Sequence, residues 1–294
     1  MDRIITSNSS VDDETLAESG FYWRDEAGLR ALICEPLKEA GFINAFSTRL
    51  GGVSNLNNLE DGRQAGFGTD LNLAGFDDDL AENIFENRRR FMNLFPGDLK
   101  LSTVWQVHGT DIKIIRNEVD ADETETRSDA IISQVKNLLV GVKTADCVPV
   151  LIGDERTGSY AAVHAGWRGT VGGIVTLTID RMMQEFDTDP NDIWAAIGPA
   201  ACGRNYEVGQ EVIDAFSSAF EAADHLFKQT RPGHAFIDLH QANREQLTSR
   251  GVPPAQIFTA PFCTMERSDL FFSYRIEKQK FGRTGRLLSV IGSV

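Results

Sequence analysis

Cysteine, positive charge and long apolar runs are all scarce in this sequence. It has four cysteines in 294 residues, and Cys34, Cys147, Cys202 and Cys263 lack the spacing of a disulfide framework. Free thiols of this kind fit a reducing compartment. No run approaches the roughly 20 apolar residues that cross a bilayer, and residues 1–13 lack the apolar core of a signal peptide. We therefore expect a soluble, cytoplasmic protein that does not enter a membrane.

The charge balance is strongly acidic. Lysines and arginines number 29 against 43 aspartates and glutamates, which gives a formal net charge of −14. This charge argues against nucleic-acid backbones and anionic membrane surfaces as partners. A small anionic ligand remains compatible, because a local arginine cluster can override the global field. Hydrophobic residues make up 41 % of the chain, enough for a sizeable core.

Short apolar segments rich in β-branched residues outnumber helical ones and favour strands. The predicted strands are 31–37, 43–48, 104–107, 112–115, 138–142, 148–152, 161–164, 193–197, 236–239, 257–260, 270–274 and 287–291. Helical spacing predicts helices over 80–95, 171–182, 212–223 and 238–250. Many strands follow one another directly. The sequence therefore predicts an α/β protein of α+β-like layout, with mixed or antiparallel sheets and outer helices.

No linker rich in Pro, Gly or Ser divides the chain. We predict a single layered domain over residues 40–294, preceded by a partly ordered N-terminal extension over 1–39. The acidic segment 118–129 is expected to be a solvated surface turn.

Two histidines and one cysteine near predicted strand ends form the most informative pattern. His108 lies in Gln-Val-His-Gly, Cys147 in Thr-Ala-Asp-Cys, and His164 in Val-His-Ala-Gly-Trp-Arg-Gly. Two imidazoles and one thiolate, with a fourth position left for water, suit a catalytic zinc site. Their long separations match no zinc-finger pattern, so the ligands have to come from separate strands. Each residue alone also fits a structural role, since a buried cysteine usually packs as a small hydrophobe.

Three further residues are candidates for the chemistry. Arg49 and Arg168 each lie in a glycine-rich turn, where backbone N–H groups and a guanidinium suit a phosphate; ordinary β-turns with exposed arginines are the alternative. Asp146, costly to bury without a partner, is the candidate proton carrier. Because adjacent strand residues point to opposite faces, Asp146 reaches the site only if the strand kinks there. The other cysteines and histidines are left outside the predicted site, with solvated roles expected for His225, His234 and His240.

Several motifs occur in a fixed order along residues 40–294. They are Phe46-Ser47-Thr48-Arg49, Gly51-Gly52-Val53-Ser54, Gln106-Val107-His108-Gly109, Asp129-Ala130, Thr144-Ala145-Asp146-Cys147-Val148-Pro149, His164-Ala165-Gly166-Trp167-Arg168-Gly169, Ile197-Gly198-Pro199, Tyr206-Glu207-Val208-Gly209, Ala242-Asn243-Arg244, Phe271-Phe272-Ser273-Tyr274-Arg275 and Thr284-Gly285-Arg286. This set resembles the bacterial YfiH/YlmD family, which is related to the human laccase-domain protein and was once labelled polyphenol oxidase or multicopper laccase.

The resemblance implies a zinc-dependent purine nucleoside enzyme. The family is credited with phosphorolysis of adenosine, inosine, guanosine and methylthioadenosine, and with deamination of adenosine. Its metal ligands fall on His108, Cys147 and His164. Its fold is a single domain of layered mixed sheets, grouped with a cysteine-hydrolase-like fold. The implied partners are purine nucleosides and phosphate, and the sequence leaves monomer and homodimer open.

Other functions remain open at this point. One is a cysteine hydrolase with Cys147 as nucleophile and His164 as base; an editing role on cytoplasmic cell-wall precursors, attached to relatives, would need such an amidase. Another is a noncatalytic zinc-stabilised module. A multicopper oxidase is disfavoured because the chain has only five histidines. The segments Ala200–Gly203 and Glu277–Gly282 depart from the family pattern and are expected to reshape a pocket rim.

Overall fold

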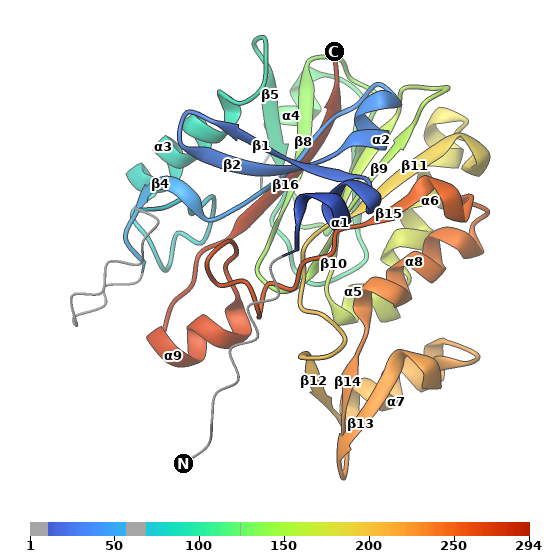
Figure 1. Cartoon of the computed structure of the whole chain (residues 1–294). Coiled ribbons are helices and arrows are strands. Elements are labelled where there is room, and N and C mark those ends of the chain that lie inside the picture. The colour runs from blue at the N-terminus through green and yellow to red at the C-terminus, as the bar shows by residue number, and fades with distance from the viewer. Residues whose placement is uncertain (1–10, 57–68, 124) are drawn as a thin grey trace.

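The structure is a computed structural model that describes residues 11–56, 69–123 and 125–294 (Figure 1). Most of its strands form two six-stranded mixed sheets. The first has the order β1 (Phe21–Glu26), β2 (Leu29–Cys34), β3 (Ile43–Ser47), β16 (Leu287–Ser293), β8 (Leu138–Thr144) and β5 (Lys100–Thr103). The second has the order β15 (Ile257–Thr259), β11 (Ile193–Ile197), β9 (Val148–Asp154), β10 (Tyr160–Ala165), β7 (Ala130–Ser133) and β6 (Ile112–Ile115). In each sheet, antiparallel pairs combine with parallel ones at an edge.

The two sheets pack face to face around one hydrophobic core. Alternate strand residues point to opposite faces, so Val140 of β8 and Leu151 of β9 face this core, whereas Val150 faces outward. Helices cover both outer faces (Figure 1): α3 (Ala81–Met92) lies over the first sheet, and α6 (Ile174–Phe186) and α8 (Leu239–Ser249) lie over the second. The predicted arrangement of mixed sheets with outer helices is confirmed.

The remaining elements are shorter. A small third sheet has the order β12 (Glu207–Gly209), β14 (His234–Ile237) and β13 (Phe227–Arg231), with α7 (Gln210–Ala219) beside it (Figure 1). The others are α1 (Asp13–Glu18), α2 (Glu35–Glu39), β4 (Leu50–Ser54), α4 (Glu118–Asp122), α5 (Trp167–Val171) and α9 (Gln279–Phe281). Three short 3-10 helices, η1 (Pro190–Asp192), η2 (Ala223–Leu226) and η3 (Pro254–Gln256), and one π-helical turn, η4 (Tyr274–Lys278), complete the described elements. In the part of the chain described, no helix has the length and apolar character that crossing a membrane requires.

The N-terminal part of the chain takes part in the first sheet. Strand β2 pairs with both β1 and β3, so residues 21–34 extend the sheet that β3 belongs to. The prediction of a partly ordered extension also covers residues 1–10, which lie outside the described residues. The division at residue 40 stays a prediction.

Three local predictions were wrong. Residues 104–107 are not a strand: β5 ends at Thr103, and Trp105 makes only an isolated bridge to Arg127. Residues 270–274 are not a strand either, because Phe271 and Phe272 are buried in the core without strand pairing. An apolar run in the sequence indicates that the segment is buried, but a buried segment need not be paired in a β-sheet. The acidic segment 118–129 contains α4 and ends at the fully buried Asp129.

Candidate metal centre

The backbone brings His108, Cys147 and His164 together where the two sheets connect. Strand β8 of the first sheet leads into β9 of the second through a bend at residues 145–147, which carries Cys147. In the antiparallel pair β9–β10, Ala165 lies opposite Val148, so the end of β10 places His164 beside the bend. His108 comes from the connection between β5 and β6.

These three residues, called here the His–Cys–His cluster, have the dimensions of a metal site. One candidate ligand atom from each lies within 4.8 Å of the other two. The imidazole centroids of His108 and His164 are 4.8 Å apart, with the rings inclined at 70°. His164 is buried, Cys147 is partly exposed and His108 is exposed. The cluster therefore has one rigid wall and one side open to solvent.

Gly166 lets the cluster close. A Cβ atom at this position would lie 2.9 Å from Nδ1 of His108 and 3.1 Å from Sγ of Cys147, closer than side chains normally tolerate. The backbone of Gly166 has φ −71°, which any residue adopts, so the requirement for glycine here is steric. The glycine that follows His164 in the sequence motif is thus part of the site.

Asp129 occurs in one of the motifs, but the sequence analysis assigns it no role in the site. It is fully buried, and its Oδ1 accepts hydrogen bonds from the Nδ1 side of His164 at 2.8 Å and from the backbone N–H of His108 at 2.9 Å. Its Oδ2 accepts from the backbone N–H groups of Gly109 at 2.7 Å and Val107 at 3.2 Å. One carboxylate thus orients two of the three residues, in the way that carboxylates commonly orient histidine ligands of metals.

The same carboxylate explains the backbone at His108. His108 has φ 58°, in the left-handed region that few residues other than glycine adopt. Three consecutive N–H groups, from Val107 to Gly109, point to Asp129. Burial raises the pKa of Asp129, but the hydrogen bonds from His164 and Gly109 lower it more, so the carboxylate stays ionised.

Cys147 and His164 stabilise each other's charged forms. Burial raises the pKa of Cys147, but the charge of His164 and hydrogen bonding from His108 outweigh it and lower the pKa to about 6. Burial likewise lowers the pKa of His164, whereas the Cys147 thiolate and the hydrogen bond with Asp129 raise it to about 9. The cluster therefore holds a thiolate, the form in which cysteine binds metals.

The chain bends at Asp146, which has φ 84°, and this is the kink that the sequence analysis required. Its Oδ1 accepts a hydrogen bond from Thr264 Oγ1 at 2.6 Å, and its Oδ2 accepts from Ser273 Oγ at 3.0 Å and from the backbone N–H of Arg275 at 2.7 Å. Burial raises its pKa despite these donors. The carboxylate thus anchors two distant segments next to Cys147.

The two arginines have different surroundings, and among the described residues neither side chain forms a hydrogen bond or ion pair with the cluster. Arg49 is buried and donates to Asp70 at 2.9 Å, to Glu277 at 2.5 Å and to the carbonyl of Ser268 at 2.9 Å. Glu277 also accepts from Thr284 and is itself buried. This residue of the expected rim insertion is therefore an interior partner of Arg49.

Arg168 lies on α5 and is more than half exposed. Its guanidinium stacks over the indole of Trp167, with 4.1 Å between the guanidinium carbon and the ring centroid. Its Nη2 atom lies 3.7 Å from Oε1 of Glu211, which is long for a direct hydrogen bond. The guanidinium of Arg168 is therefore largely available to bind an anion.

Two of the cysteines outside the predicted site lie close to each other and to a carboxylate. Cys202 and Cys263 lie with Glu266 in a second group whose ligand atoms are within 4.8 Å of one another. All four cysteines of the chain are free. His240, expected at the surface, is half-buried and lies 3.1 Å from the carbonyl of Gly198.

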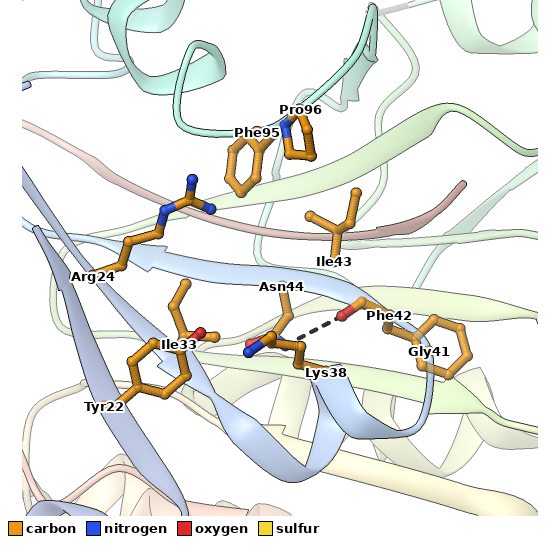
Figure 2. Close-up of a pocket in the computed structure, with 10 residues that line it drawn as sticks. All are labelled: Tyr22, Arg24, Ile33, Lys38, Gly41, Phe42, Ile43, Asn44, Phe95 and Pro96. Atoms are coloured by element: carbon orange, nitrogen blue, oxygen red, sulfur yellow. Dashed lines mark hydrogen bonds between the residues drawn. The ribbon is translucent and has the colours of Figure 1, made fainter. Parts of the chain in front are cut away.

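A separate cavity of about 300 Å³ opens on the first sheet (Figure 2). Ile33 and Phe95 are among the mostly apolar side chains that line it. The two cations beside it are already paired, Arg24 with Glu26 and Lys38 with Glu35. No residue of the His–Cys–His cluster lines this cavity.

The sequence has clear relatives. Residues 43–293 match the family described as "Multi-copper polyphenol oxidoreductase laccase". A purine nucleoside phosphorylase of Bacteroides thetaiotaomicron is 35 % identical over 274 residues, which cover 89 % of this chain and 96 % of that protein. Adenosine deaminase RL5, from an unknown prokaryotic organism, is 36 % identical over 250 residues, covering 82 % and 92 % of the two chains.

Solved structures show the same fold. The crystal structure of YlmD from Geobacillus stearothermophilus superimposes with a TM-score of 0.80 at 30 % identity, covering 92 % of this chain and 98 % of that one. The crystal structure of a YfiH protein from Bacillus licheniformis gives a TM-score of 0.81 at 29 % identity, with coverage of 92 % and 99 %.

Proposed function

The chain belongs to the laccase-like family of the YfiH and YlmD proteins, and on this premise we propose that it is a zinc-dependent purine nucleoside enzyme. The proposed reactions are phosphorolysis of adenosine, inosine, guanosine and methylthioadenosine, and deamination of adenosine. Relatives named for each of the two chemistries match most of the chain. The observation that carries the proposal is the His–Cys–His cluster, with one buried carboxylate orienting two of its members.

The donor set of the cluster fits zinc. It offers one thiolate and two imidazoles, and the hydrogen bond of His164 Nδ1 with Asp129 leaves Nε2 free as a ligand atom. The exposed side of His108 leaves room for a further ligand. A zinc ion held there would act as a Lewis acid and activate water or polarise a substrate atom. A multicopper centre needs many more histidines, and only two of the chain's five lie in the cluster.

Residues of this chain would supply the remaining functions. Arg168, with its weakly engaged guanidinium, would hold phosphate and offset the charge of the attacking group. Arg49 is retained as a second phosphate ligand, although phosphate would have to compete with Asp70 and Glu277 for its guanidinium.

Asp146 is the proposed proton carrier. Burial raises the pKa of its carboxyl group, which favours proton uptake. We expect Asp146→Asn to lower turnover at least tenfold while the zinc content stays unchanged. Unchanged turnover would remove Asp146 from the mechanism and leave it with its structural role toward Thr264 and Ser273.

Incubation of the zinc-loaded protein with adenosine, with and without phosphate, tests the proposal. Chromatography would separate adenine, formed only with phosphate, from inosine, formed without it. Both activities should disappear in Cys147→Ser, whose hydroxyl is a poor zinc ligand at neutral pH. A folded, zinc-loaded protein that forms neither product would contradict the proposal.

A second candidate function is favoured by the charge state of Cys147 and His164. A thiolate beside an imidazolium is the arrangement of cysteine hydrolases, and an amidase acting on cytoplasmic cell-wall precursors would use it. Zinc content separates the two, because a thiolate bound to zinc is a poor free nucleophile. Tight zinc at one equivalent per chain supports the nucleoside enzyme, whereas amide hydrolysis by metal-free protein supports the hydrolase. A cytoplasmic location and a monomeric or dimeric state remain predictions.

A further inference from the structure

Cys202 and Cys263 lie side by side because they follow two adjacent parallel strands. Strands β11 and β15 pair in parallel, with Ile197 opposite Thr259. The segments that leave their C-terminal ends continue together: Ala200 bridges to Cys263, and the backbone N–H of Thr264 donates to the carbonyl of Ala200 at 3.0 Å. Two cysteines 61 residues apart are thereby brought to one place.

Hydrogen-bond donors surround the two sulfur atoms. The backbone N–H of Cys202 donates to Sγ of Cys263 at 3.2 Å. The side-chain amide nitrogen of Asn205 lies 3.7 Å from Sγ of Cys263, 3.5 Å from Sγ of Cys202 and 2.7 Å from Oε1 of Glu266. Arg204 forms a bidentate ion pair with Glu266. Every acceptor of the group already has a donor.

This arrangement favours a thiolate over a bound cation. A metal ion at the centre of the group would take the place of the Asn205 amide, which contacts all three acceptor atoms. The Arg204 guanidinium already balances the charge of Glu266. The donors that oppose a cation are the same ones that stabilise negative charge on sulfur.

The two thiols differ in acidity, and Cys263 is the more acidic. The hydrogen bond from the Cys202 thiol lowers the pKa of Cys263 to about 6 against the opposing effect of burial, with help from the Cys202 N–H and Asn205. The pKa of Cys202 is raised by the neighbouring Cys263 and by partial burial, and its thiol lies 3.9 Å from Oε1 of Glu266. When a thiolate is oxidised to a sulfenic acid, an adjacent thiol can condense with it to form a disulfide.

We propose that Cys202 and Cys263 form a peroxide-sensitive dithiol that closes to an intramolecular disulfide. The Cys263 thiolate attacks one oxygen of hydrogen peroxide, the O–O bond breaks, and the departing hydroxide takes up a proton to become water. The Cys202 thiol then loses its proton, its sulfur attacks the sulfenic sulfur of Cys263, and the S–O bond breaks with release of the second water. Two thiols and one peroxide give one disulfide and two waters, and a small thiol reverses the change.

The new bond would clamp the segments that hold Asp146. Thr264, next to Cys263, donates its hydroxyl to Asp146, and Ala201, next to Cys202, donates its backbone N–H to the Asp146 carbonyl at 2.9 Å. Asp146 directly precedes Cys147 of the His–Cys–His cluster. Because the crosslink also restricts the unfolded chain, we expect oxidation to raise the Tm by on the order of 5–10 °C.

Peptide mapping of the zinc-loaded protein tests the proposal without reference to any nucleoside activity. After treatment with hydrogen peroxide and alkylation, trypsin releases Cys202 in peptide 182–204 and Cys263 in peptide 251–267. We expect the two to appear crosslinked, two hydrogens lighter than their sum, and to separate on reduction. Cys34 serves as the internal control, because burial raises its pKa to about 12 and keeps it a thiol.

Two further measurements make the outcome decisive. In Cys202→Ser the crosslink should be absent, and dimedone should capture a sulfenic acid on Cys263. Crosslinking should be at least tenfold slower in protein unfolded with guanidinium, where the donors around sulfur are lost. The proposal is overturned by absence of the crosslink in folded protein, by an equal rate in unfolded protein, or by a second equivalent of metal that protects both cysteines.

Discussion

Replacement of Asp129 by asparagine isolates the role of one carboxylate. Asp129 accepts four hydrogen bonds, two at each oxygen, and an asparagine of the same shape keeps one oxygen and gains an NH₂ group. If the NH₂ replaces Oδ2, it faces the N–H groups of Val107 and Gly109, and two partly buried donors lose their acceptor. If it replaces Oδ1, it donates to His164 Nδ1 and forces the ring proton onto Nε2, the atom that a metal needs.

Both orientations weaken a metal site, by different routes. The first releases the backbone that shapes the loop of His108, at a cost of about 1–3 kcal/mol for each unpaired donor. The second gives His164 the wrong tautomer. Loss of such an orienting carboxylate typically lowers metal affinity about 10–100-fold, which corresponds to roughly 1.4–2.7 kcal/mol. We expect Asp129→Asn to lie within this range, measured by competition with a chromophoric zinc chelator.

Asp154 provides a matched control. It is also fully buried and also accepts backbone N–H groups, from Arg156 and Thr157, but it lies at the opposite end of β9 from Cys147. Asp154→Asn should lower the free energy of unfolding and leave zinc affinity unchanged. The reasoning is refuted if Asp129→Asn binds zinc as tightly as the unaltered protein while losing only the stability that Asp154→Asn loses.

Three other outcomes follow from the site. Gly166→Ala should lower zinc affinity at least tenfold, because the added Cβ meets His108 and Cys147. Gly209→Ala should leave zinc affinity unchanged, because a Cβ there meets nothing within 4 Å. Equal zinc affinities in the two variants would refute the steric argument. In metal-free protein Cys147 should react with iodoacetamide at pH 7, and the rate should fall as the pH drops through about 6 because the thiolate is protonated there; zinc should suppress the reaction, and a rate that is independent of zinc would place the ligand elsewhere. Arg168→Ala should raise the KM for phosphate about tenfold with the deamination rate unchanged, and an unchanged phosphate KM would exclude this arginine from the phosphate site.

Local chemistry made part of the site predictable. Imidazole and thiolate side chains next to strand ends suit a metal, which predicts His108, Cys147 and His164, and the structure brings the three together. Asp146 can reach the site only if the strand bends there, and its positive φ shows this bend. The mixed sheets and most strands followed from short β-branched apolar runs.

The missed features depend on contacts that sequence spacing does not encode. Asp129 ends an acidic stretch whose composition predicts solvent exposure, yet antiparallel pairing of β7 with β10 places it in the interior beside His164. Cys202 and Cys263 meet only because β11 and β15 are neighbours in the second sheet. Strand register and strand order arise only in the assembled sheets. The sequence alone therefore does not predict the contact of Asp129 with His164 or that of Cys202 with Cys263.

X-ray absorption at the zinc edge of the purified protein tests the central claim most directly. The account predicts one zinc per chain with a single sulfur at about 2.3 Å and two imidazole nitrogens at about 2.0–2.1 Å, completed by one further light atom. The sulfur shell should vanish in Cys147→Ser. A zinc shell with two sulfurs would place the ion at Cys202 and Cys263, and a shell with none would exclude Cys147; either result would contradict the His–Cys–His centre.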